Sequence, residues 1–565
     1  MSKECIVDQI HCNICLNNPT YIYQIDLESG PYIISQPGLY ILMENIKTNF
    51  FKTKSSALQF NNNDKFGHSA AIKIQCNNVI LNLNGYYISQ SPQDYCVQRF
   101  FAIIQLNDMP FNPNVGPITV QTQQTLKTAN NCIIKNGVIG LSSHQSILGN
   151  NNSNIIIENV QCEDFEVSGI ILNNVKNVYI DNCSIGQSLG LNRFVPLTPF
   201  FAGLTFNHKL LSCILDNNNI LKTPTETNII NTIINTLNSV LNPILNIIYL
   251  YTTLSEIFNH LLQLYNNNST NPDIYLLINP SGLSPCNIHG IKITGKNPSI
   301  GPFHISTGEI NLNDYSSNIN INGTVIKDLL AKIDEKVILT ENNEIIHVGA
   351  GLKATDTFIN TDIGKILMNN IYNLINTNQT IRNLVKTNIS LNVINFINYN
   401  VNSGTIGFKR SMDIMGHINK GVIGIRVGLN QTTCINNVKI YNIENKGSEL
   451  STLELNTIIT KYDGINIVPT MDTTFLSPLL YTGSYAVGFI ISGSNDIHTN
   501  CIDTRNIFSP NGCAVGCAVN NMCNNIVLNN VYIGNLLSCD TCNDSTTLLI
   551  DYKAKCVKLD NITIN

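Results

Sequence analysis

The feature that most restricts the fold is a six-residue pattern of asparagine, apolar, any, apolar, any, asparagine that recurs along the chain. Seven segments share this frame, the last with cysteine in the first position: 131–136, 154–159, 177–182, 437–442, 495–500, 525–530 and 556–561. The first three begin 23 residues apart, and the later ones are separated by longer and less regular intervals. Repetition with a period of roughly 20–50 residues is typical of solenoids, propellers and other repeat architectures.

The second and fourth positions of the frame are mostly apolar, which predicts a strand with one buried face. A repeat of 23 residues is too short for a strand, a crossover helix and a second strand. It accommodates three short strands joined by turns. We therefore predict a mainly β chain, folded as a right-handed parallel β-helix in which each strand pairs with its equivalent one coil away. In this frame the side chains of Cys183, His498 and Cys501 point into the core.

The asparagine that closes each frame has an expected mechanical role. Asparagine tolerates the left-handed backbone conformation of tight turns, and stacked asparagines can hydrogen-bond to one another as a ladder. The chain contains 88 asparagines in 565 residues, which this role explains. The predicted ladder residues are Asn136, Asn159, Asn182, Asn442, Asn500, Asn530 and Asn561.

Two stretches with helical periodicity interrupt the strand pattern. In the first, Asn231, Asn235, Asn238, Asn242 and Asn246 fall on one helical face opposite an apolar face, and we expect this helix to break near Pro243. These asparagines disfavour a membrane span, because hydrocarbon leaves polar groups unsatisfied. The predicted segments are an N-terminal cap for the open end of the solenoid (1–65), β-helix (66–215), helical insertion (216–272), β-helix (273–325), helical or irregular insertion (326–400) and β-helix (401–565).

Charge and targeting signals exclude several function classes. The formal net charge is −5, which argues against a nucleic-acid partner, because such proteins need a basic surface. The first residues lack a basic stretch followed by an apolar run, so we expect no signal peptide and reduced thiols. Open ends of a β-helix carry unpaired strand edges, so we expect the chain to associate with itself.

Two N-terminal segments carry a resemblance to a known family. Residues 30–42 (GPYIISQPGLYIL) and 71–85 (AIKIQCNNVILNLNG) resemble the opening of pectin-lyase-like β-helix proteins, most closely those of mimivirus-type giant DNA viruses. The resemblance implies the β-helix fold and a virion surface or fibril protein. β-Helix proteins of this kind also include polysaccharide lyases, hydrolases and phage tailspikes.

The motifs of the enzymes in this class are largely missing. Asn360-Thr-Asp362 matches the hydrolase aspartate element in letters only, Gly416-His417 lacks the following glycine, and the chain has no Arg-x-Lys sequence. The fifth frame position stacks Glu158 and Asp181 in successive coils. Such a pair could bind Ca²⁺, and Arg193 would be the candidate base of a lyase.

The favoured alternative to Ca²⁺ binding is neutralisation within the chain. Lys135 occupies the same frame position in the preceding coil and would neutralise Glu158, while solvent screens Asp181.

Zinc has one candidate set of ligands, Cys5, His11, Cys12 and Cys15, with spacing that could supply four ligands. Cysteines that serve as small buried apolar residues are the favoured interpretation. We therefore expect no cofactor.

Three functions are compatible with these sequence features. We favour a non-enzymatic structural protein in the surface layer of a giant-virus particle, made in the infected host cytoplasm and bound to itself and to other virion proteins. The alternatives are a carbohydrate-active β-helix enzyme and a non-catalytic module that binds glycans through exposed tyrosines.

Overall fold

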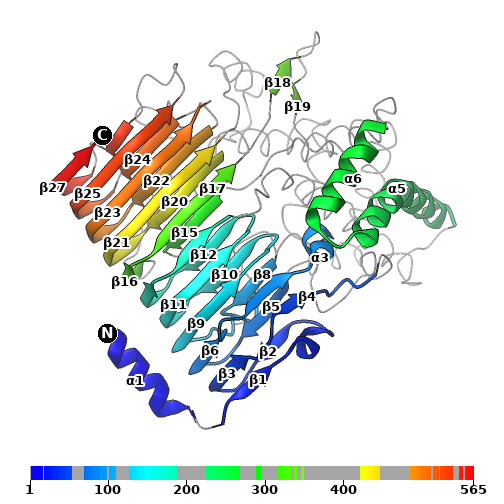
Figure 1. Cartoon of the computed structure of the whole chain (residues 1–565), viewed down its shortest axis with the longest axis horizontal. Helices are drawn as coiled ribbons and strands as arrows, with labels where there is room; N and C mark the ends of the chain where they lie inside the picture. The colour runs from blue at the N-terminus through cyan, green and yellow to red at the C-terminus, as the bar shows by residue number, and fades with distance from the viewer. Residues whose placement is uncertain are drawn as a thin grey trace.

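The chain folds as a parallel β-helix in the computed structural model, as Figure 1 shows. All strand pairs of its two large sheets are parallel, and each strand pairs with its equivalent in the neighbouring coil. The described residues are 2–14, 16, 18–53, 69–97, 101–109, 126–187, 224–267, 288–295, 315–331, 336–339, 345–348, 420–445, 484–510, 513–520, 522–538, 546–551 and 554–565.

The larger sheet has 15 strands and carries the asparagine frame. Its main path consists of β1 (Thr20–Ile22), β3 (Gly38–Leu42), β6 (Val79–Asn82), β9 (Cys132–Ile139), β11 (Ser153–Glu163), β13 (Lys176–Asp181), β16 (Ser316–Asn322), β21 (Asn430–Asn445), β23 (Asn495–Ser509), β25 (Asn524–Ser538) and β27 (Lys555–Ile564). Four shorter strands pair beside this path: β4 (Ile46–Thr48), β7 (Tyr87–Gln90), β14 (Ser184–Gly186) and β17 (Val325–Ala331).

The smaller sheet has 10 strands and forms a further face of each coil. Its strands are β2 (Tyr32–Ile34), β5 (Ser69–Ile74), β8 (Phe101–Gln105), β10 (Gln145–Asn150), β12 (Ser168–Asn173), β15 (Ile288–Thr294), β20 (Lys420–Gly428), β22 (Ser484–Ser492), β24 (Cys513–Val519) and β26 (Thr546–Ile550).

Long strands of the larger sheet bend at one asparagine and so supply two faces of a coil. In β11, the residues before Asn159 pair with β13, and the residues after it pair with β14. Asn159 has φ +54°, a left-handed value that asparagine adopts more readily than most residues. Each coil therefore has three faces, two from the larger sheet and one from the smaller, and the predicted fold class is confirmed.

The asparagine ladder forms at both ends of the frame. At the closing positions, Asn159 donates to Asn136 at 3.3 Å and Asn561 donates to Asn530 at 3.1 Å. The opening positions form a second ladder that was not expected from the sequence. There Asn154 donates to Asn131 at 2.7 Å, Asn177 to Asn154 at 2.8 Å and Asn318 to Asn177 at 2.7 Å. The opening residues of these frames also have left-handed backbones, including Asn131, Asn154, Asn177 and Asn318.

Two of the predicted frames are wrong in register. Strand pairing aligns Asn322 with Asn436, Asn436 with Asn500, and Asn500 with Asn529. Each of these residues is the fifth of its frame, so the true copies of the frame are 432–437 and 496–501. Asn442 belongs to a third ladder, where it donates to Asp328 at 2.8 Å and accepts from Asn506 at 2.9 Å. Asn500 accepts from Asn530 at 2.8 Å although its own frame closes at Cys501. The predicted frame at 437–442 is therefore shifted by five residues and the one at 495–500 by one. Asparagine is so frequent here that both shifted frames still resemble the pattern.

The shift in register reverses the predicted orientation of the side chains concerned. His498 is exposed and the neighbouring Thr499 is buried, because a slip of one residue moves a strand's side chains to the opposite face. Cys501 is also exposed, with φ +56° at the ladder position. Cys183 is buried as predicted, and its thiol contacts the carbonyl oxygen of Ile157 at 3.6 Å.

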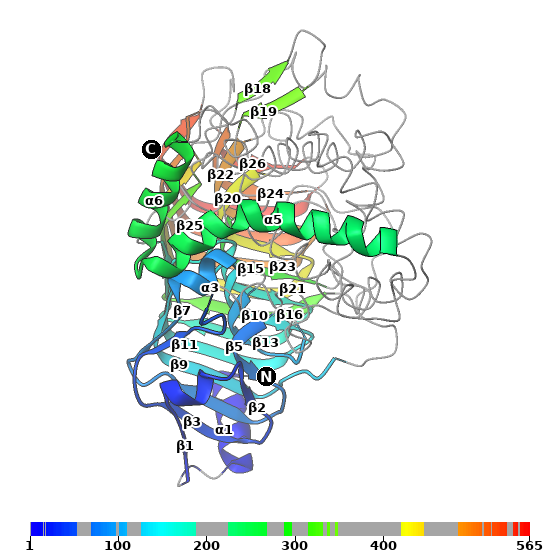
Figure 2. The same ribbon diagram turned by 90° about the vertical axis from the view of Figure 1, so that its right-hand side faces the viewer.

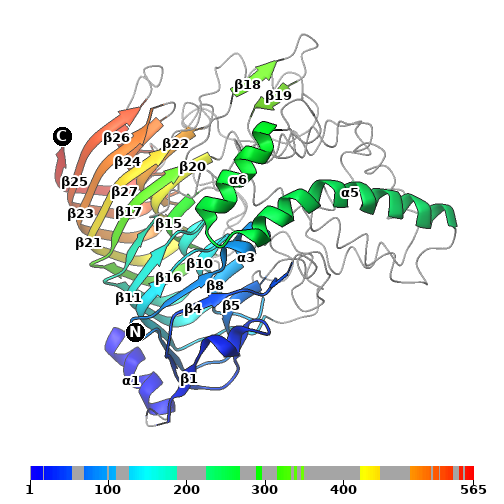
Figure 3. The ribbon, with the colours of Figure 1, turned by 45° about the vertical axis from the view of Figure 1, so that its right-hand side comes forward.

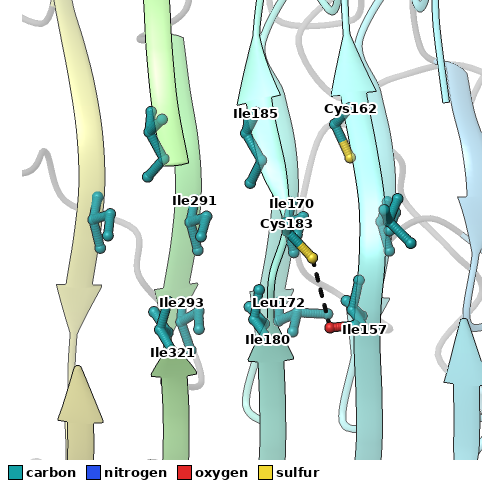
Figure 4. Close-up of a cluster of buried hydrophobic side chains, with 14 of the residues drawn as sticks. Ile157, Cys162, Ile170, Leu172, Ile180, Cys183, Ile185, Ile291, Ile293 and Ile321 are labelled. Carbon is teal, nitrogen blue, oxygen red and sulfur yellow. Dashed lines mark hydrogen bonds between the residues drawn. The ribbon is translucent and has the colours of Figure 1, made fainter. Parts of the chain in front are cut away.

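The core consists of aligned rows of apolar side chains inside the coils. Figure 4 shows one part of it, where Ile157, Ile180 and Ile321 occupy equivalent positions of the larger sheet. Ile170 and Ile291 form a matching row in the smaller sheet. All five have no exposed surface. Burying an isoleucine side chain contributes roughly 1.5–3 kcal/mol, so these rows are the main source of stability.

Within the N-terminal segment 1–65, helix α1 (Lys3–Asn13) does not lie at the open end of the solenoid. It lies beside the strands of the larger sheet, as Figure 1 shows, and its buried residues pack on that sheet. The end of the core is instead closed by β1 and the 3₁₀ helix η1 (Gln24–Leu27), through the buried side chains of Ile22 and Leu27. Helix α1 is amphipathic and requires a surface with exposed apolar residues, which the flank of the sheet provides.

The first insertion is helical, as its periodicity predicts. Helix α5 (Pro224–Leu250) continues through Pro243 instead of breaking there, and α6 (Leu254–Asn267) follows it. Figure 3 shows α5 extending away from the solenoid. The short helix α3 (Pro92–Val97) lies next to the C-terminal end of α5 in both Figure 1 and Figure 2. Among the described helices, none is long and apolar enough to cross a membrane.

The predicted start of the second insertion, at residue 326, falls within a strand. β17 pairs with β14 and β21 as part of a coil and ends at Ala331. Beyond it, β18 (Lys336–Leu339) and β19 (Ile345–Val348) form an antiparallel pair. The stretch that motivated the helical prediction lies outside the described residues, as do Asp362 and His417.

A ladder residue tests how much the asparagines stabilise the coil. We expect Asn154→Ala to lower the free energy of unfolding by about 3 kcal/mol. The loss of two ladder hydrogen bonds contributes ~1 kcal/mol each, and the cost of holding alanine in the left-handed backbone conformation contributes ~1 kcal/mol. Asn154→Gly is the matched control, because glycine adopts this backbone freely, and it should lose about 1 kcal/mol less. Denaturant unfolding measures both variants. Equal losses would contradict a role for the backbone conformation.

Candidate functional site

Helix α1 covers a row of apolar side chains on the outer face of the larger sheet. The third frame position points outward, and in the first coils it holds Leu39, Ile80, Ile133, Ile156 and Tyr179. Ile6 and Ile10 of α1 pack on this row and have no exposed surface. In the next coil the row becomes polar at Asn320. The helix therefore covers the part of the row that would otherwise expose apolar surface to water.

The two carboxylates singled out from the sequence lie at the end of this helix. Glu158 and Asp181 are in register in adjacent coils, and Lys135 is in register with Glu158 on the other side, as the frame predicts. The ammonium of Lys3 lies between the carboxylates, with its Nζ 2.9 Å from Glu158 Oε2 and 2.5 Å from Asp181 Oδ2. Among the described residues, Glu158 therefore forms its ion pair with Lys3. This corrects the expected pairing of Glu158 with Lys135.

The cation that neutralises the pair comes from the chain itself. Partial burial lowers the pKa of Lys3, but hydrogen bonds and charge interactions with Asp181 and Glu158 outweigh it and hold the pKa above its ordinary value. Lys3 occupies the space between the carboxylates that a Ca²⁺ ion would need. Within the described residues, no three acidic, histidine or cysteine side chains are grouped to hold a metal. Arg193 lies outside the described residues.

The candidate zinc ligands do not form a metal site within the part of the chain that the structure describes. Cys5, His11 and Cys12 lie on α1, and Cys5 and Cys12 are exposed free thiols. Cys15 lies outside the described residues. Several other cysteines serve as buried apolar residues; burial raises the pKa of Cys183 to about 12, so its thiolate does not form near neutral pH. This agrees with cysteine as a small core residue.

A second exposed group of side chains lies on the outer face of β21, β23 and β25. Arg505 is in register with Tyr441 on one side and Gly534 on the other. Because Gly534 has no side chain, the ring of Tyr532 leans over it, and the Arg505 guanidinium lies 4.4 Å from the centre of that ring. Arg505 also pairs with Asp503 at 2.6 Å. A guanidinium against one tyrosine ring, with a second tyrosine at the paired position of the neighbouring strand, forms a surface suited to stacking flat ligands.

This surface was not singled out from the sequence. The sequence signal is weak, because only the correct register places Tyr441 and Gly534 beside Arg505. The register error in the 495–500 frame hid this alignment.

Comparisons with known proteins assign this chain to no family. No family model matches this chain, and no curated protein matches it. A solved structure similar to it is a tailspike protein of an E. coli bacteriophage in complex with a pentasaccharide, with a TM-score of 0.28 and 8% sequence identity. The match covers 99% of this chain and 60% of the tailspike chain.

The Lys3 contact should hold α1 on the sheet. We expect Lys3→Gln to accelerate hydrogen exchange in residues 3–13 roughly fivefold, the equivalent of ~1 kcal/mol for an ion pair of this exposure. Lys3→Arg should restore slow exchange. Mass spectrometry of the N-terminal peptide measures all three proteins. Unchanged exchange in Lys3→Gln would mean that the apolar contacts alone hold the helix.

The same contact has a defined pH dependence. A lysine whose folded pKa is raised stabilises the docked state fully below its ordinary pKa of 10.5, and this contribution disappears as pH rises through the folded pKa. The difference between the original protein and Lys3→Gln should therefore vanish in strongly alkaline solution. Comparing the same peptide in both proteins removes the intrinsic effect of pH on exchange.

Proposed function

We propose that this chain is a structural protein of a giant-virus particle, placed in the surface layer as a component of its fibrils. The observation that carries the proposal is one continuous sheet from β1 to β27, reinforced by side-chain ladders at the corners of its coils. The N-terminal resemblance to mimivirus-type β-helix proteins supports the viral setting. In this proposal the protein is made in the infected cytoplasm and joins copies of itself and other virion proteins.

The physical reason is that a solenoid of this kind resists bending and local unfolding. Each coil is bonded to its neighbours by backbone hydrogen bonds, core rows and ladder amides. Repeat proteins contact only adjacent repeats, so their stability accumulates along the stack. Such a rod suits an exposed position on a particle, and its neutral, asparagine-rich corners carry few charges that salt could screen.

Mass spectrometry of purified particles tests the location. We expect peptides of this chain to be enriched in particles relative to infected cytoplasm, and to disappear when the particle surface is shaved with protease while an internal capsid protein remains. The internal capsid protein is the control for particle integrity. Finding the chain only in infected cytoplasm would contradict the proposal.

The proposal also includes the absence of polysaccharide cleavage. We expect the purified protein to release no unsaturated products from a panel of polysaccharides in the presence of Ca²⁺, because Lys3 already neutralises Glu158 and Asp181. Ultraviolet absorbance of the products measures the reaction. Activity that is abolished by Asp181→Ala and kept by Lys135→Ala would establish a lyase instead.

A second candidate function is glycan binding without catalysis. The row of Tyr441, Arg505 and Tyr532 favours it, because aromatic rings and a guanidinium on one flat face can stack on sugar rings. In a particle protein this function is compatible with the structural one, since the row lies on the outer surface of the solenoid.

A further inference from the structure

A cavity of about 550 Å³ lies where the helical insertion meets the first coils of the solenoid. Its walls come from η1, strand β4 with the segment that follows it, helix α3 and the C-terminal end of α5. Figure 3 shows β4, α3 and the C-terminal end of α5 on the same side of the solenoid. The volume falls within the range of about 300–1,000 Å³ that is usual for small-molecule sites. It lies apart from the Lys3 contact, which is on the flank covered by α1.

The solenoid side of the cavity is held by hydrogen bonds to the backbone. The side-chain amide of Gln24 donates to the carbonyl oxygen of Lys47 at 3.0 Å and accepts from its amide at 2.8 Å. The fully buried Asp94 carboxylate accepts from the amides of Phe50 at 2.8 Å and Phe51 at 3.0 Å. These bonds fix the segment that carries Lys47, Asn49 and Lys52.

The insertion is attached to the other side by further bonds. Tyr249 donates its hydroxyl to the carbonyl oxygen of Phe51 at 2.9 Å, and Gln93 donates to the carbonyl oxygen of Tyr251 at 2.8 Å. Tyr249 is largely buried, and burial raises its pKa above the ordinary value. Helix α5 therefore completes the cavity, which the solenoid alone does not form.

The lining has the chemistry of a site for a hydroxylated anion. Lys47 and Lys52 supply two positive charges and Glu28, 3.4 Å from Lys52, supplies one negative charge, so the net charge is positive. Ser91 is 2% exposed; its oxygen accepts from the Asp94 amide, so its hydroxyl proton can be donated to a ligand. Asn49 also lines the cavity, and its buried Oδ1 has no hydrogen-bond partner among the described residues.

We propose that this cavity binds a small polyol that carries one anionic group, either a sugar phosphate or a sugar acid. Lys47 pairs with the anionic group, while Ser91 and Asn49 bond the hydroxyl groups. A charged hydrogen bond is roughly twice as strong as a neutral one, so Lys47 supplies most of the affinity. The site is independent of the proposed location in a virus particle, because it needs only the folded chain.

Calorimetric titration of the full-length protein tests this proposal with four probes: glucose 6-phosphate, glucuronate, glucose and inorganic phosphate. We expect at least one of the two sugar anions to bind, and to bind at least about tenfold more tightly than glucose or phosphate. Binding by glucose 6-phosphate alone identifies a sugar phosphate, and binding by glucuronate alone identifies a sugar acid. Equal binding of inorganic phosphate, or no binding of either sugar anion, would overturn the proposal.

Matched variants locate the binding site. Lys47→Gln should weaken binding of the sugar anion about tenfold and Asn49→Ala a few-fold, whereas Lys558→Gln, which removes an exposed lysine at the far end of the solenoid, should change nothing. Lys47 is exposed, so its substitution should leave the thermal unfolding temperature unchanged and the folded state intact. Unchanged affinity in Lys47→Gln would place the ligand elsewhere.

Discussion

The structure depends on the left-handed turn that asparagine makes at the corners of each coil. This turn bends one strand into two limbs, so a single segment can supply two faces of the solenoid. The amide that remains at the corner then bonds to the same position one coil away, as Asn131, Asn154 and Asn177 show. The geometric requirement and the cohesive bond are met by one residue type. This accounts for the high asparagine content without any chemical role for most of these side chains.

Departures from the ladder also have a local explanation. Where asparagine is replaced, the same left-handed backbone is retained by Gly323, Thr432, Asp496, Cys501 and Cys556. Asp328 and Asp496 still accept the ladder hydrogen bond, because a carboxylate oxygen has the same position as the amide oxygen. At Cys501, which supplies no such amide, Asn530 turns to Asn500 instead. The corner geometry is thus maintained more strictly than the amide itself.

The outer faces of the coils are specialised although their backbone is uniform. One row is apolar for five coils and is covered by α1, with Lys3 placed at the carboxylates of Glu158 and Asp181. Another part of the surface carries Tyr441, Arg505 and Tyr532 in neighbouring coils. The insertion that contains α5 adds a cavity that no coil forms by itself. A rigid scaffold with variable surface elements is a common way to position binding groups.

The sequence by itself determined the fold class, the position of the first helical insertion and the alignment of Glu158 with Asp181, because each depends on local periodicity and a constant repeat. It could not determine the register of the later coils, since asparagines are dense enough to fit two alignments and long insertions remove the constant spacing. His498 and Asn442 were misplaced for that reason. Tertiary structure alone decided the partner of Glu158 and Asp181. This partner is Lys3, which precedes Glu158 by 155 residues in the sequence. It also decided the cavity at α5, because packing between distant segments has no signature in local sequence.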